Sequence, residues 1–167
     1  WDRLPKGDRE KIIAQIRRIR AKASEAIFEE LISRPNVAPS VFAAYANTLE
    51  EQGDREGAAE LLSNAILGED DSIGAAERAI LAVDLGRRYL DAVQKDKAEE
   101  WFRIAREVQP ESNPVAEKGL VLLWQQRNNA ANLATALKAL LKKEEENPGT
   151  VDRKANLRLL IRALLDS

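Results

Sequence analysis

The chain of 167 residues contains no cysteine, no histidine and no methionine, and aromatic residues make up only 5% of it. Without cysteine and histidine it has no disulfide, no thiol nucleophile, no imidazole catalyst and none of the usual zinc ligands. No apolar run approaches the roughly 18 residues that a membrane-spanning helix needs. A net charge of −2 gives no reason to expect a nucleic-acid partner. We therefore expect no metal, no cofactor and no membrane span in this segment.

The missing methionine, with Trp1 at the first position, indicates a piece cut from a longer chain. The lack of a signal peptide therefore says nothing about the parent protein. A cysteine-free chain fits a cytoplasmic or a periplasmic location equally.

What the chain has in abundance is strong helix formers, namely alanine, leucine, glutamate, lysine and arginine. Apolar residues recur every three or four positions, and no alternating strand pattern occurs. Ser40, Asp54 and Asp96 fit helix N-caps, while Gly53 and Asn128 fit the turns between helices. The patterns predict an all-α chain of about eight helices, over residues 8–33, 41–52, 54–67, 75–94, 96–108, 112–126, 130–146 and 151–165.

Four times an alanine is followed by a large apolar residue four positions on and by a helix-stopping residue eight after that. The sets are Ala23–Ile27–Pro35, Ala58–Leu62–Asp70, Ala98–Phe102–Pro110 and Ala136–Leu140–Pro148. A period between about 20 and 50 residues is typical of stacked helical repeats. The recurrence therefore predicts an array of helical hairpins, which presents an extended surface.

Two of these units resemble the tetratricopeptide (TPR) repeat family. The stronger one reads Leu85-Gly86-x2-Tyr89, Ala98-x3-Phe102-x2-Ala105, Pro110, and the one before it reads Tyr45-Ala46-x2-Leu49, Gly53, Ala58-x3-Leu62-x2-Ala65, with Asp70 in place of proline. The resemblance implies an α-solenoid of antiparallel helical hairpins wound into a right-handed superhelix. In such hairpins small residues lie where two helices approach closely, and large ones fill the gap to the neighbouring helix.

The resemblance divides one domain of residues 1–167 into five parts. These are an N-terminal helix resembling a half-repeat (8–35), repeat 1 (40–70), repeat 2 (75–110), a stretched repeat 3 (113–148) and a capping or truncated helix (150–167). The third unit is stretched because its second helix comes about five residues later than the family's spacing allows.

In the TPR family the first helix of each hairpin lines a concave face that carries the ligand contacts. Carried onto this chain, the partner-binding positions would be Asn47, Glu50, Glu51, Arg87, Leu90 and Asp91. Ala43 and Val83 stand where the carboxylate-clamp members of the family need cations, which argues against binding of a chain terminus in that manner. Acids and one base along a groove suit an extended polypeptide.

The resemblance and the lack of catalytic side chains predict a non-enzymatic scaffold that binds a protein or peptide. An alternative is a structural or oligomerising spacer from a longer array, associating through its end helices, in an envelope or periplasmic assembly. The acidic run 69–71 and the helix end 144–146 are expected to be solvated, and the basic cluster 17–22 to be the wet face of its helix. The apolar residues of 157–165 fit core packing, a truncated repeat or a partner contact.

Overall fold

The computed structural model describes residues 6–34, 37–68, 73–109, 114–146, 148–149 and 152–166. Within these ranges the chain forms eight α-helices and no strand, which confirms the all-α prediction. The helices are α1 (Lys6–Ile32), α2 (Pro39–Glu51), α3 (Arg55–Leu67), α4 (Ala75–Asp91), α5 (Lys95–Val108), α6 (Val115–Gln126), α7 (Ala130–Glu146) and α8 (Arg153–Leu165).

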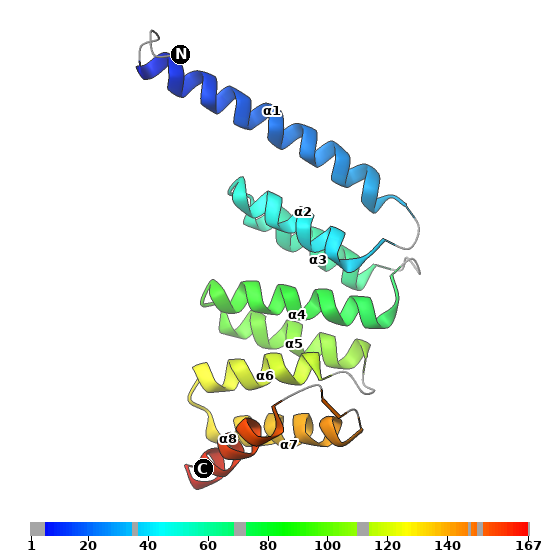
Figure 1. Cartoon of the computed structure of the whole chain (residues 1–167), viewed down its shortest axis with the longest axis vertical. Helices are drawn as coiled ribbons and strands as arrows, with labels where there is room; N and C mark the ends of the chain where they lie inside the picture. The colour runs from blue at the N-terminus through cyan, green and yellow to red at the C-terminus, as the bar shows by residue number, and fades with distance from the viewer. Residues whose placement is uncertain are drawn as a thin grey trace.

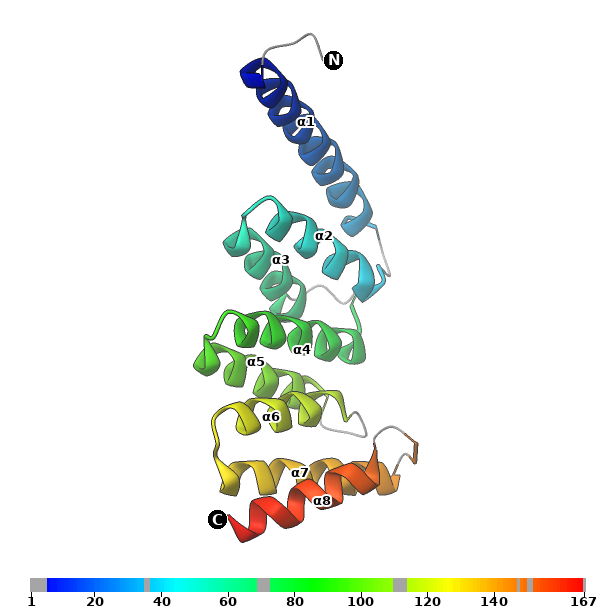
Figure 2. The ribbon, with the colours of Figure 1, turned by 60° about the vertical axis from the view of Figure 1, so that its left-hand side comes forward.

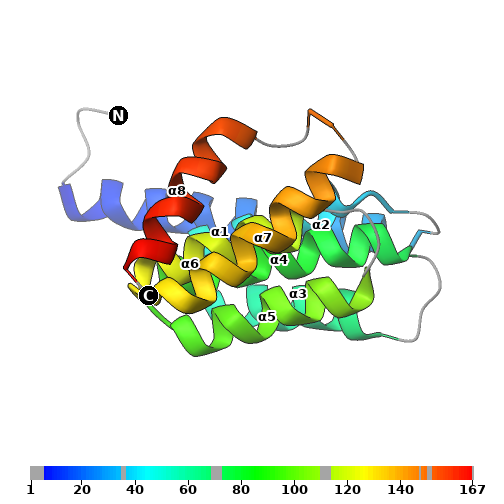
Figure 3. The same ribbon diagram turned by 90° about the horizontal axis from the view of Figure 1, so that it is seen from below.

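The helices follow one another along one long axis, with α1 at one end and α8 at the other (Figures 1 and 2). Each helix contacts the next one in the chain. In addition α4 contacts both α2 and α6, whereas α3, α5 and α7 make no contacts with one another over the ranges described. Viewed from below, α3 and α5 lie on one side of α4, and α8 lies on the other side (Figure 3). The helices α2, α4 and α6 therefore form one continuous layer.

The residues of the recurring pattern form the core in three of the four sets. The alanines and the large residues that follow them are buried, namely Ala58, Leu62, Ala98, Phe102, Ala136 and Leu140. Because residues four apart share one face of a helix, each pair faces the neighbouring helices together. The pattern therefore marks positions that are buried on α3, α5 and α7.

Phe102 is held between two glycines on different helices. A Cβ atom built on Gly86 of α4 would lie 2.6 Å from Cε1 of Phe102, and one built on Gly119 of α6 would lie 2.5 Å from its Cδ1. Both distances are far below van der Waals contact, so only glycine lets these backbones come so close to the ring. The ring of Phe102 thereby connects α4, α5 and α6.

The first set of the pattern behaves differently, because most of α1 extends beyond α2 (Figure 1). Ile27 is 58% exposed, although its place in the pattern predicts burial. The next residue, Phe28, makes the contact instead, and its ring stacks on Tyr45 with centroids 5.0 Å apart. Burial is the main reason why the pKa of Tyr45 is raised.

Several helix ends follow the predicted local chemistry. The carboxylate of Asp54 accepts a hydrogen bond from the backbone N–H of Gly57 at 2.8 Å, which confirms it as the N-cap of α3. Gly53 has a φ of 90° and Asn128 a φ of 51°, as the turns before α3 and α7 require. These signals act over a few residues, so the sequence alone sufficed to place them.

Two predicted caps are wrong. Ser40 lies inside α2, which begins at Pro39, and the N-cap residue Ala38 makes no side-chain capping bond. Proline suits this first position because it has no N–H to be capped. Asp96 lies inside α5, which begins at Lys95 with Gln94 as its N-cap residue. The preceding helix α4 ends at Asp91, and Val93, with a φ of 61°, lies in the turn between the two helices.

The sequence predicts that the acidic C-terminal end of α7 is solvated, and this prediction is wrong for Glu144. Glu144 is buried, and its carboxylate accepts a hydrogen bond from the backbone N–H of Gly149 at 2.6 Å. The carboxylate of Asp152 then caps α8 by accepting from the N–H of Ala155 at 3.0 Å. The predicted helix starts at residues 112 and 151, and the acidic run 69–71, lie outside the described residues.

Candidate functional site on the α2–α4–α6 face

The surface built by α2, α4 and α6 on their side away from α3 and α5 is the candidate site, and we call it the α2–α4–α6 face. It carries a hollow of about 260 Å³. The hollow is lined by Pro39, Ser40, Ala43, Ile80, Leu81, Val83, Asp84, Arg87 and Val115. Residues from three helices therefore meet at one place, although they are up to 76 positions apart in the chain (Pro39 to Val115).

The hollow is apolar at its base and charged at its edge. Leu81 and Val83 are buried, whereas Ile80 is 46% exposed and Arg87 is exposed. The short side chain of Ala43 leaves space on the α2 side. Such a site suits an apolar side chain, with Arg87 beside it as a hydrogen-bond donor for a carbonyl or a carboxylate.

The six partner-binding positions predicted from the sequence do not all lie at this hollow. Arg87 lines it; Asn47, Glu51 and Asp91 are exposed elsewhere on α2 and α4, Glu50 is half-buried, and Leu90 is only 3% exposed. Leu90 belongs to the hydrophobic core and offers almost no surface to a partner. Ala43 and Val83, which the resemblance places on the ligand side, do line the hollow.

Asn47 and Glu50 are engaged within the chain by Arg88, a residue that the sequence did not single out. The guanidinium of Arg88 donates from Nη2 to Oδ1 of Asn47 at 2.7 Å. Its Nη1 lies 2.8 Å from Oε2 of Glu50, and its Nε donates to Oδ2 of Asp84 at 2.9 Å. One arginine therefore ties α4 to two polar positions of α2.

The environment of Arg88 keeps its charge in place. Partial burial acts to lower the pKa of the guanidinium, but the hydrogen bonds and charges of Asp84 and Glu50 outweigh it and raise that pKa. The pair Asp84–Arg88 has a spacing of four on one helix, which is a recognised pattern for an ion pair. That spacing was the one signal in the sequence that could have revealed the cluster.

Over the part of the chain that the structure describes, no three acidic side chains are grouped as a metal ion would need. None of the described helices is both long and apolar enough to cross a bilayer.

Comparison with known proteins adds no assignment, because no family model and no curated protein matches the chain.

Proposed function

We propose that the chain is a non-enzymatic interaction module that binds a polypeptide segment on the α2–α4–α6 face of a TPR-like α-solenoid. The observation that carries the proposal is the hollow at Ile80 and Arg87, where an exposed apolar side chain and a cation meet. An exposed isoleucine beside a cavity offers an apolar contact to a side chain of a partner. Residues that become buried at the centre of an interface supply most of its binding energy.

The same face shows which of the exposed charges a partner would use. Asn47 and Glu50 already satisfy Arg88, so a partner that took them would have to break those bonds. Arg87 lines the hollow, and no described residue of α2 is hydrogen-bonded or ion-paired with it. We therefore place the binding centre at the hollow, with Glu51 and Asp91 as peripheral contacts.

Substitution of residues that line the hollow should weaken peptide binding. Peptides selected by phage display on the whole chain are expected to lose at least about tenfold in affinity for Ile80→Glu and Arg87→Glu variants. Both side chains are exposed, so the fold should survive, which circular dichroism checks. Fluorescence anisotropy with labelled peptides gives the affinities.

Lys138→Glu serves as the matched control, since Lys138 is an exposed cation on α7, away from this face. It should bind the selected peptides as tightly as the natural chain does. Equal affinity of all three variants would move the binding site to another surface.

A structural or oligomerising role is the second candidate, because both end helices expose apolar residues. Ile16, Ile19 and Ile27 on α1, and Leu157, Ile161, Leu164 and Leu165 on α8, are exposed. Scattered exposed apolar residues are normal, but a helix with several of them on its surface indicates a contact site.

End-to-end association should therefore depend on α8. If this role holds, the mass measured by light scattering rises with concentration, and a combined Ile161→Glu and Leu165→Glu variant remains a monomer. Those two side chains are 59% and 82% exposed, so the variant should keep its fold. A natural chain that stays monomeric at millimolar concentration would exclude self-association.

A further inference from the structure

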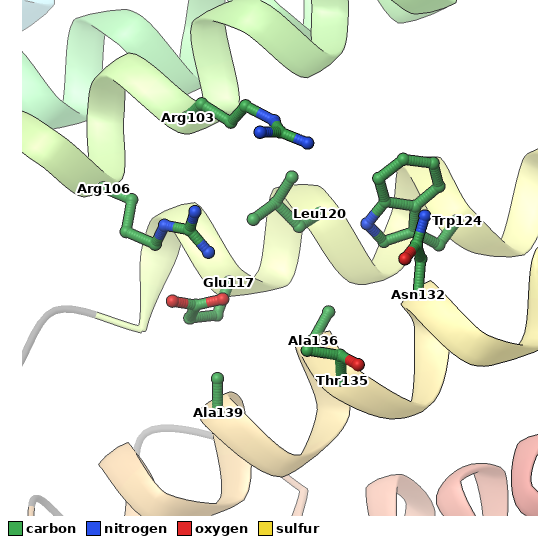
Figure 4. Close-up of a pocket in the computed structure, with 9 residues that line it drawn as sticks. All are labelled: Arg103, Arg106, Glu117, Leu120, Trp124, Asn132, Thr135, Ala136 and Ala139. Atoms are coloured by element: carbon green, nitrogen blue, oxygen red, sulfur yellow. The ribbon is translucent and has the colours of Figure 1, made fainter.

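A second cavity lies between α5, α6 and α7, on the opposite side of α6 from the α2–α4–α6 face. It encloses about 130 Å³. Its walls are Arg103 and Arg106 from α5, Glu117, Leu120 and Trp124 from α6, and Asn132, Thr135, Ala136 and Ala139 from α7 (Figure 4). The side chains of α6 lie between those of α5 and those of α7 (Figure 4).

Glu117 is the unusual member of this group. It is only 2% exposed, and its Oε2 atom is buried and has no hydrogen-bond partner in the part of the chain described. Buried carboxylates are nearly always paired, because removing an ionised group from water is strongly unfavourable. An unpartnered buried Oε2 atom in the wall of a cavity indicates a missing hydrogen-bond donor.

The cations among the residues that line the cavity, Arg103 and Arg106, both come from α5. Figure 4 shows the guanidinium of Arg106 above the Glu117 carboxylate, with Arg103 further along the same wall. Arg103 is occupied, since its Nε and Nη2 both donate to Oε1 of Glu99, at 2.9 and 2.5 Å. Arg106 makes no ion pair with any described residue, and its side chain is exposed. The cavity thus combines the buried carboxyl group of Glu117 with the guanidinium of Arg106, which is not paired with another described residue.

This arrangement selects against simple ions of either sign. A cation would be attracted by Glu117 but repelled by Arg106. An anion would be attracted by Arg106 but repelled by Glu117. A zwitterion satisfies both groups. The rest of the wall, with Leu120, Ala136 and Ala139, is small and apolar, so the ligand should also carry an aliphatic part.

We propose that this cavity binds a small aliphatic α-amino acid, with its ammonium group on Glu117, its carboxylate towards Arg106 and its side chain near Leu120 and Ala136. A water molecule occupies about 30 Å³ in the liquid. The cavity of about 130 Å³ is therefore large enough for an amino acid between alanine and valine in size. None of the residues that line this cavity also lines the hollow on the α2–α4–α6 face, so each site can be tested without the other.

The test is calorimetric titration of the purified chain with L-valine, L-alanine, isobutylamine and isobutyrate. The amino acids should bind saturably, and the amine and the acid should each bind at least about tenfold more weakly, because each lacks one charge-assisted hydrogen bond. Glu117→Gln and Arg106→Gln should weaken L-valine binding by a similar factor. Glu100→Gln, an exposed glutamate on α5 that does not line the cavity, is the control and should bind as the natural chain does.

A thermal melt without ligand separates a binding role from a structural one. Glu117→Gln removes a buried charge without a partner, so the variant should melt at the same or a higher temperature than the natural chain. Loss of binding together with a clearly lower melting temperature would make Glu117 a structural residue and overturn the proposal. The absence of saturable amino-acid binding, or equal binding of isobutylamine, would also overturn it.

Discussion

Replacing Phe102 by alanine is expected to lower the free energy of unfolding by about 3–5 kcal/mol, the usual range for a buried phenylalanine. Phe102 is 0% exposed, and its ring lies directly against the backbones of Gly86 and Gly119. Neither glycine has a side chain that could move into the vacated space, so the cavity would stay open. Urea denaturation followed by circular dichroism measures the loss. Phe28→Ala is the matched control and should lose less than half as much, because Phe28 is only half-buried at the edge of the core.

The same packing predicts that Gly86→Ala destabilises the natural chain but stabilises the Phe102→Ala variant. In the natural chain the added methyl group meets the Phe102 ring at 2.6 Å, and overpacking of this kind costs about 1–3 kcal/mol. In the Phe102→Ala background the methyl group has room, and alanine favours a helix over glycine by about 1 kcal/mol. The double-mutant cycle should therefore show strong coupling. If Gly86→Ala destabilised both backgrounds equally, the ring could not lie against Gly86.

Replacing Arg88 by alanine is expected to lower the free energy of unfolding by about 1–3 kcal/mol. The side chain of Arg88 is 14% exposed and serves three partners, of which Glu50 and Asp84 are each 35% exposed. Removal leaves two acids close together without their cation, although water can still reach both. This access is why the expected loss is smaller than for a fully buried pair.

Arg87→Ala, one position along the same helix, is the control for this effect. Arg87 is exposed, and substitution of such a residue usually changes stability by no more than about 0.5 kcal/mol. Arg88→Lys should recover only part of the loss, because an ammonium group cannot reproduce the fork that reaches Asn47, Glu50 and Asp84. Equal stability of the Arg87→Ala and Arg88→Ala chains would show that the cluster does not hold α2 against α4.

Much of the helical architecture was predictable because its signals are local. The turn at Gly53 and the cap at Asp54 depend on backbone geometry within a few residues. The alanine and large-residue pairs, such as Ala98 and Phe102, were predictable for a related reason, since a spacing of four places both on one face of a helix. Ile27 is the exception. Its helix α1 has the right spacing, but most of its length extends beyond α2, so no neighbour among the described residues covers it.

The candidate site was predictable only in part. The resemblance placed Ala43, Val83 and Arg87 together on one face, and they line one hollow. It also placed Leu90 there, and the core buries that side chain. The rotation of a helix about its own axis decides whether a given side chain faces the hollow or the core. Turning a helix by the angle between two successive residues changes which side chains face outward. Periodicity indicates a face but not how wide that face is.

By itself, the sequence determined the helices, most of their ends and the alanine and large-residue pairs that are buried on α3, α5 and α7. Helix propensity, turn chemistry and apolar spacing act within one or two turns of chain, so neighbours in the sequence are sufficient evidence. Only the tertiary structure decided which charged groups meet. Arg88 reaches Asn47 across 41 positions, and Glu117 lies in a cavity walled by α5 and α7. The contacts of long charged side chains depend on the distances between stacked helices. The periodicity of the sequence does not predict those distances.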